Sequence, residues 1–172
     1  MVTIRAELSS DIAAREALLT AAFGPNRLRK TSEKLRSGRV PALAFTAVDD
    51  KGKLIGTTRL WNIIAGSAGS SLLLGPLAVD CKHQGTGIGR ALMEQAIFAA
   101  RDLGANSIVL VGDEPYYSRF GFNSALTRSL HLSGPVERNR FLGLELEPQA
   151  LDDAEGLVAA SGEFTVDHAI AA

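Results

Sequence analysis

A glycine-rich segment joins an apolar strand pattern to an amphipathic helix pattern, and this junction restricts the folds open to the chain. Residues 71–79 are largely apolar, and Gly75-Pro76 inside them predicts a strand that bulges or lies at a sheet edge, because proline has no N–H to donate. Glycines follow at 85, 87 and 89. Apolar residues then recur at helical spacing up to a capping Gly104: Ile88, Leu92, Ala96, Ala99 and Leu103. Such a loop lets the N–H groups of a helix start approach an anion, although a tight turn would require the same glycines.

The rest of the chain predicts one mixed α/β domain. Strict alternation over residues 2–8 indicates a half-buried strand, and Ser9-Ser10-Asp11 offers N-cap residues for a helix that ends at Gly24. The other expected elements are a short helix at 27–37, strands at 42–48 and 53–64 joined by a turn at 49–52, a loop at 65–71, a buried strand at 107–111, an irregular or helical stretch at 112–122 and a strand at 141–146. Residues 1–150 are expected to form the domain. Residues 151–172 would be a tail or an extension of it, weakly held from Asp152 onward.

The composition is globular and shows no membrane span. The 172 residues are 46 % hydrophobic and 22 % charged, and no apolar run approaches the roughly 18 residues that a spanning helix needs. Charges at Arg5, Glu7 and Asp11 interrupt any signal-peptide core. A single cysteine, Cys81, and only three histidines argue against disulfides and a structural zinc site. We therefore expect a cytoplasmic protein without a metal.

Charge is distributed unevenly along the chain. Residues 1–86 contain twelve Lys or Arg and seven Asp or Glu, whereas residues 87–172 contain six and twelve. Much of the positive excess lies in one segment, where Glu33 is the only acidic residue: Arg27, Arg29, Lys30, Lys34, Arg36 and Arg39. This segment is either a solvated helix face or a surface that attracts an anion.

Two familiar phosphate motifs are excluded, and a third pattern fits. The chain has no Gly-x-x-x-x-Gly-Lys-Ser/Thr, and the glycine spacing is wrong for a dinucleotide site. Gln84-x-x-Gly87-x-Gly89 instead resembles the pyrophosphate-binding signature Arg/Gln-x-x-Gly-x-Gly/Ala of the GNAT superfamily of acetyltransferases. The run from Tyr117 to Gly121-Phe122 matches that superfamily's second signature, Tyr-x-x-x-Gly-Phe. The resemblance covers roughly residues 2–148, and Gly112–Tyr117 and Leu144–Pro148 are most similar to its YhbS-like branch.

The resemblance implies a fold, a co-substrate and a binding site. The implied GNAT fold has a central mixed, mostly antiparallel sheet of about six to seven strands flanked by helices. The co-substrate would be acetyl-CoA, with its pantetheine arm paired to the strand end at 77–79 and its pyrophosphate on the N–H groups of the glycine loop. Leu110 stands where many relatives have an asparagine that touches the cofactor. The implied cofactor-binding residues are Leu77, Ala78, Val79, Gln84, Gly85, Thr86, Gly87, Ile88, Gly89, Arg90 and Tyr117.

The chemistry of acetyl transfer assigns further roles. Tyr117 is the candidate general acid for the leaving thiolate, because a phenol is protonated at neutral pH, and the Val79 N–H could bond the thioester oxygen. Asp80, Glu114 and Asp113 are candidate general bases, although carboxylates beside turns are often only solvated or capping. Cys81 lacks the partners of a covalent nucleophile. Trp61 and Phe45 read as core residues rather than stacking groups for an acceptor.

Several functions remain open. The leading hypothesis is direct acetyl transfer to a primary amine. The alternatives are an acyl-CoA-binding regulatory domain without turnover, or transfer to a protein N-terminus or aminoacylated RNA. The basic segment would select a small anionic amine rather than nucleic acid, because the C-terminal half is acidic. The sequence leaves the oligomeric state open, with a homodimer among the assemblies that it allows.

Overall fold

A single twisted sheet runs through the molecule, and helices cover both of its faces. The computed structural model describes residues 1–166. Along the sheet the strands follow the order β1 (Thr3–Ala6), β2 (Leu43–Val48), β3 (Leu54–Ala65), β4 (Ser70–Leu74), β6 (Ser107–Val111) and β8 (Phe141–Glu145). Neighbours on this path are antiparallel except for β4 and β6, which are parallel. The mixed α+β class is therefore confirmed.

Three further strands lie off this path. β5 (Ala78–Val79) and β9 (Glu155–Ala160) both pair with β3, and β7 (Ser129–His131) pairs with β9. Within residues 1–166 the sheet thus has nine strands, more than the six to seven expected.

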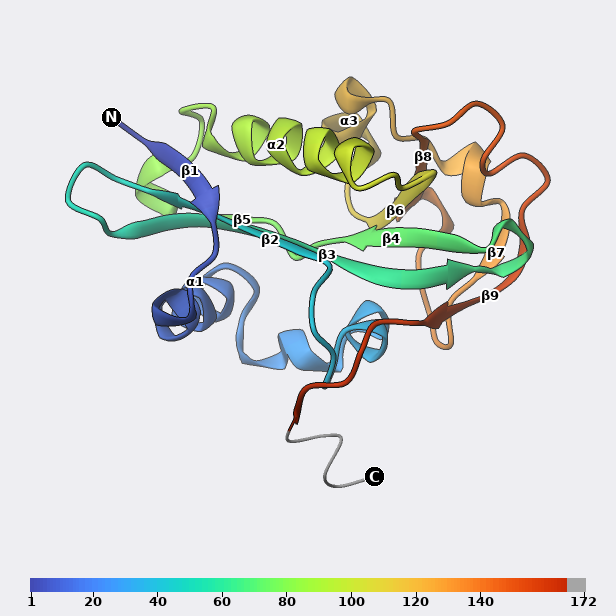
Figure 1. Ribbon diagram of the computed structural model, residues 1–172, viewed down its shortest axis with the longest axis horizontal. Coiled ribbons are helices and arrows are strands. Elements are labelled where there is room, and N and C mark those ends of the chain that lie inside the picture. Colours follow the sequence, from blue (N-terminus) through green and yellow to red (C-terminus); the bar gives the residue numbers. More distant parts are fainter. Residues whose placement is uncertain (167–172) are drawn as a thin grey trace.

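Two apolar layers follow from the alternation of side chains along the strands. α2 (Ile88–Asp102) covers one face, and α1 (Ile12–Phe23) lies on the other (Figure 1). Leu72, Leu74 and Ile108 pack in the cluster under α2, whereas Leu73 and Val109 pack in the opposite one. α3 (Glu114–Tyr117) follows β6, and short 3₁₀ helices span Ser9–Asp11, Pro25–Arg29, Thr31–Leu35, Gly66–Ala68, Cys81–His83, Ser118–Phe120, Ser124–Thr127 and Arg138–Arg140.

Three expectations about local structure were wrong. The single strand at 71–79 is two strands, because the chain leaves the ladder at Gly75-Pro76. The helix at 27–37 is replaced by two 3₁₀ helices. The C-terminal segment is not weakly held, since β9 pairs with β3 on the edge opposite β4, beyond the end of β2, and aligns Ala160 with Ile63. The end of the predicted tail, residues 167–172, lies outside the described residues.

The helices of residues 1–166 are too short or too polar for one of them to cross a bilayer.

Candidate active site

The sheet opens at the break between β4 and β5. β4 pairs with β6 through only Leu72–Ile108 and Leu73–Val109, after which the strands diverge. β5 continues along β3 but has no ladder to β6. The Asp80 N–H donates to the Ile55 carbonyl at 2.8 Å, and antiparallel ladders alternate, so the N–H and C=O of Val79 point away from β3. An unpaired strand edge therefore faces the opening.

A pocket of about 790 Å³ occupies this opening on the α1 side. Its floor is formed by Leu73–Leu77 from the strand break and by residues 110–113 after β6. Two segments distant in sequence close it, the basic residues 27–36 and the loop 132–140. The latter wall was missed in the sequence, because residues 132–140 show no periodicity and no motif. Its pocket-lining members are Leu132, Pro135, Val136, Glu137 and Arg140.

Tyr117 lies on the wall of this pocket. Its ring packs so closely on Gly112 that a side chain at 112 would overlap it. The ring is perpendicular to that of Tyr116, with centroids 4.9 Å apart, and contacts Phe122 edge-on. Burial raises the pKa of the Tyr117 hydroxyl to about 12, and the charge of Asp113 adds to this effect. The hydroxyl is therefore a proton donor at every physiological pH.

The neighbouring Tyr116 points elsewhere. Its hydroxyl lies 2.9 Å from the position that a Cβ on Gly89 would take, at the first turn of α2. Arg119 covers the Tyr116 ring, with its guanidinium carbon 4.8 Å from the centroid. The two tyrosines thus separate the site into a pocket side and a loop side.

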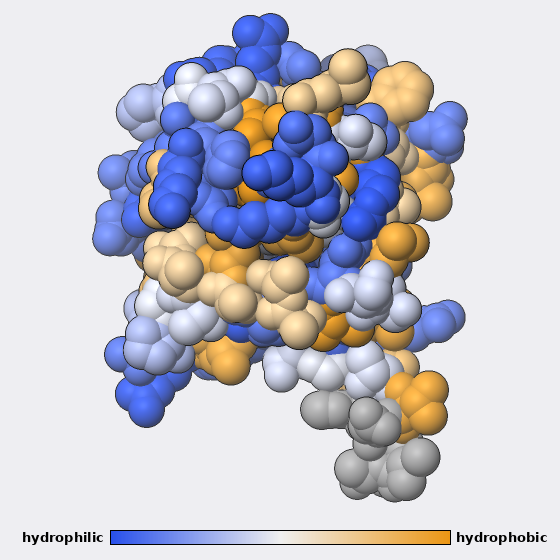
Figure 2. Space-filling model, turned by 90° about the vertical axis from the view of Figure 1, so that its left-hand side faces the viewer, coloured by the Kyte–Doolittle hydropathy of each residue, from blue (hydrophilic) through white to orange (hydrophobic). Residues whose placement is uncertain are grey.

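The glycine loop has the conformation of an anion cradle. Gly85 and Gly87 have φ of +75° and +88°, and a Cβ on either would meet open space, so they are required by the backbone and not by packing. Gly87 precedes α2, whose first N–H groups have no carbonyl of their own helix to bond. Thr86 and Gln84 hold the loop through hydrogen bonds to the carbonyls of His83 (2.5 Å) and Val79 (3.4 Å). This end of the molecule, which also carries the β2–β3 turn, shows hydrophilic side chains around a smaller apolar area (Figure 2).

The candidate bases do not lie together. Asp80 caps the 3₁₀ helix after β5 by accepting from the Lys82 N–H, and this hydrogen bond lowers its pKa. Glu114 accepts from the N–H and hydroxyl of Ser124. Asp80 and Glu114 do not line the pocket. The exposed Cys81 does not line it either. Asp113 does line it, 3.7 Å from Arg140.

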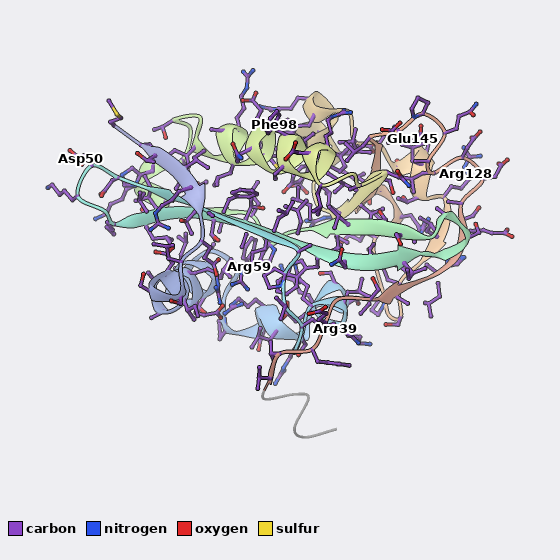
Figure 3. The ribbon with its side chains drawn as sticks, viewed as in Figure 1. Arg39, Asp50, Arg59, Phe98, Arg128 and Glu145 are labelled. Atoms are coloured by element: carbon purple, nitrogen blue, oxygen red, sulfur yellow. The ribbon has the colours of Figure 1, made fainter. Side chains whose placement is uncertain are left out.

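A partly buried ionic chain joins the basic segment to the strand break. Arg27 pairs with Glu16, Glu16 with Arg15, and Arg15 with Glu7. Glu7 also binds Arg59, which lies between the sheet and the α1 side (Figure 3).

At the sheet, this chain meets Trp61. Arg59 stacks over the Trp61 ring at 5.4 Å, and the indole N–H donates to the Gly75 carbonyl at 2.7 Å. Trp61 and Phe45 are 6 % and 8 % exposed, so their assignment to the core is confirmed.

Within residues 1–166, no group of three or more His, Cys, Asp or Glu side chains is arranged to hold a metal ion.

Comparisons with known proteins agree with this geometry. Residues 41–124 match the model of the acetyltransferase (GNAT) domain. The chain is 31 % identical over 156 residues to the uncharacterized N-acetyltransferase YhbS of Escherichia coli, covering 90 % of this chain and 93 % of that protein.

Two crystal structures are similar over nearly the whole chain. YhbS from Escherichia coli in complex with CoA has a TM-score of 0.79 and 30 % identity, covering 93 % of this chain and 89 % of that one. A GNAT family acetyltransferase from Brucella melitensis in complex with acetyl-CoA has a TM-score of 0.71 and 29 % identity, covering 94 % and 96 %. The chain therefore belongs to the GNAT family of N-acetyltransferases, the acyltransferases that use acetyl-CoA as co-substrate.

Proposed function

We propose that this protein transfers the acetyl group of acetyl-CoA directly to a small primary amine bound in the pocket between residues 27–36 and 132–140. The observation that carries the proposal is the opening between β5 and β6. It brings together an unpaired strand edge, a partly buried tyrosine hydroxyl and a pocket for an acceptor. The glycine loop lies at the other end of the same strand edge.

The residues present fit acetyl-CoA. The N–H groups of residues 85–90 would hold its pyrophosphate, because the loop and the α2 N-terminus together offer free donors to an anion. Gln84 would keep the loop against β5 through its hydrogen bond to Val79. The Val79 N–H and the Leu77 C=O would pair with the amides of the pantetheine arm. Ala78 belongs to the same strand, but the ladder turns its N–H and C=O toward β3, so it would contribute packing only.

The bound thioester supplies an activated acetyl group. Transfer forms a C–N bond and breaks the C–S bond, so the leaving thiolate needs a proton and the amine must lose one. The Leu77 N–H, on the same free edge as that of Val79 but in the pocket lining, would stabilise the negative charge on the thioester oxygen. Tyr117 would donate to the thiolate, since its raised pKa keeps the hydroxyl protonated.

Asp113 is the carboxylate that we assign as proton acceptor for the amine, directly or through water. The pocket also contains Glu33 and Glu137. Glu33 is bound to Arg36, and Glu137 belongs to the outer loop, whereas Asp113 adjoins the segment that carries Tyr117. Asp80 and Glu114 are replaced in this role because their oxygens already cap other segments.

Release of free thiol from acetyl-CoA in the presence of a panel of primary amines tests the proposal. Amine-dependent release, with a matching N-acetyl product by mass spectrometry, is expected. Binding of acetyl-CoA without release for any small amine, protein N-terminus or aminoacylated RNA would instead support a regulatory domain. Rates that are highest with aminoacylated RNA and fall steeply with salt would contradict a small acceptor.

A further inference from the structure

The six cations of the basic segment are not equivalent in the structure. Arg39 does not line the pocket: it bonds the Gly162 carbonyl and stacks on Phe164, below Arg59 in the view of Figure 3. Lys34 donates to the Ser133 carbonyl. Arg27 is neutralised by Glu16. Only Arg29, Lys30 and Arg36 line the pocket without being paired to a residue outside it.

Arg36 is the buried member of this set. Its side chain is 8 % exposed. Nε donates to Glu33 and Nη2 to the Ser32 hydroxyl, both at 3.1 Å. Nη1 bonds nothing else in residues 1–166 and lies 3.5 Å from the position that a Cβ on Gly75 would take. A buried guanidinium therefore presents one nitrogen, with two N–H groups, at the strand break.

The surroundings of Arg36 favour an anion in the pocket. Arg29 and Lys30 form no ion pair within the described chain, and Lys30 instead lies 4.7 Å over the Phe23 ring. Burial lowers the pKa of Arg36, and an added negative partner would offset that cost. The rest of the lining is mixed. It includes the charged residues Asp113, Glu137 and Arg140 and a set of apolar residues that an apolar side chain could contact: Leu73, Pro76, Leu77, Leu132, Pro135 and Val136.

We propose that the acceptor is a small α-amino acid with an apolar side chain, and that Nη1 of Arg36 binds its carboxylate. This inference rests on the proposed function, which places the thioester at Leu77, in the pocket lining next to the strand break at Gly75-Pro76. An anion held on Arg36 is then close to the reacting carbon, so only an amine a few bonds from its carboxylate can reach it. Glu33 stays in the site, and a dianionic phosphate would meet stronger repulsion from it than a carboxylate does.

A matched pair of acceptors tests the assignment. 3-Methylbutylamine is leucine without its carboxylate, so the two differ by the group that Arg36 would bind. We expect kcat/KM for leucine to exceed that for 3-methylbutylamine by about 10- to 100-fold, the effect of one hydrogen-bonded charge pair. The phosphonate analogue of leucine should be poorer than leucine.

Variants of Arg36 should reduce or abolish the preference for the carboxylate and leave the KM for acetyl-CoA unchanged. The double variant R36Q/E33Q removes both partners, so that no buried charge is left unpaired. It should bring the ratio of kcat/KM for leucine to kcat/KM for 3-methylbutylamine to about 1, while the KM for acetyl-CoA changes less than about 2-fold. Arg36→Lys keeps the charge and should retain part of the ratio. Lys51→Gln, on the distant β2–β3 turn, is the matched control and should behave like the wild type.

The outcomes separate this inference from the proposed function. Turnover of amines with no advantage for the carboxylate, or with an advantage that survives in R36Q/E33Q, overturns the Arg36 assignment and leaves amine acetylation standing. A phosphonate that outperforms leucine also overturns it. Absence of turnover with every amine overturns both. The comparison of leucine with 3-methylbutylamine uses the wild-type protein. It can therefore contradict the inference even if a variant folds poorly.

Discussion

The two sides of the candidate active site are built in different ways. The loop side consists of consecutive residues: β5, the glycine loop and the first turn of α2 lie within residues 77–90. The pocket side joins residues 27–36, 110–113 and 132–140, which approach one another only in the fold. A binding surface made of backbone groups can be short and local. A surface that selects an acceptor by its side chains draws on distant segments and is held by packing and ion pairs.

Tyr117 stands where the two sides meet, and its loss should have the largest effect. Tyr117→Phe removes the hydroxyl but keeps the ring on Gly112, so kcat should fall by about 10- to 10³-fold with little change in acetyl-CoA affinity. Steady-state rates and calorimetry with acetyl-CoA measure the two quantities.

Tyr116→Phe is the matched control, because Tyr116 faces Gly89 and the loop. Its effect on kcat should be much smaller. Equal losses in both variants would show that the boundary between the two sides does not run between these tyrosines.

A negative charge on the glycine loop should weaken the binding of acetyl-CoA. Gly87→Glu brings a carboxylate and an unfavourable φ to the start of α2, so acetyl-CoA affinity should fall by about 10- to 100-fold. Gly104→Glu shares the positive φ and the open surroundings, but lies at the other end of α2. Calorimetry should show near wild-type affinity for Gly104→Glu. Equal affinities in the two variants would contradict the placement of the pyrophosphate.

Asp113→Asn, on the pocket side, should lower kcat less than Tyr117→Phe does. Loss of a proton acceptor that works partly through water should lower kcat by about 10-fold and leave the KM for acetyl-CoA unchanged. Asp80→Asn, which alters a cap and not the pocket, is the control. An equal loss of kcat in both variants would contradict a role for Asp113 as proton acceptor. An increase only in the KM for the amine would make Asp113 a binding residue.

The smallest expected effect is on the alkaline side of the pH profile. The Tyr117 pKa of about 12 lies above the ordinary value of 10, so the hydroxyl stays protonated as pH rises through 10. Activity should therefore rise with deprotonation of the amine and show no loss assigned to Tyr117 up to about pH 10. A descending limb near pH 8 that disappears in Tyr117→Phe would contradict the raised pKa of its hydroxyl.

The difference between the two sides also decided what the sequence could predict. The glycine loop, α2 and β6 follow from local patterns, and the structure confirms these elements. The wall at 132–140 was missed, since an irregular loop acquires its position from packing alone. The basic segment was expected to be one helix, yet it forms two 3₁₀ helices. The first begins at Pro25, and the Thr31 hydroxyl at the start of the second donates to the Pro135 carbonyl.

The same limit applies to the choice among the carboxylates and explains the error about the C-terminal segment. Asp80, Asp113 and Glu114 all stand near the site in sequence, but hydrogen bonds that depend on the fold turn two of them to other uses. β9 has weak local signals because its conformation depends on the edge of β3 that it joins.

The unpaired edge of β5 has a consequence for solubility. Exposed strand edges invite pairing with another chain, and proteins usually cover or shorten them. β5 is only two residues long, and the chain turns away at Asp80, so the edge offers little length for a second molecule. A ligand that pairs with it would cover what remains and, at 100 times its dissociation constant, would stabilise the folded state by about 2.7 kcal/mol. Cells rich in acetyl-CoA would thus protect this enzyme from aggregation while supplying it with substrate.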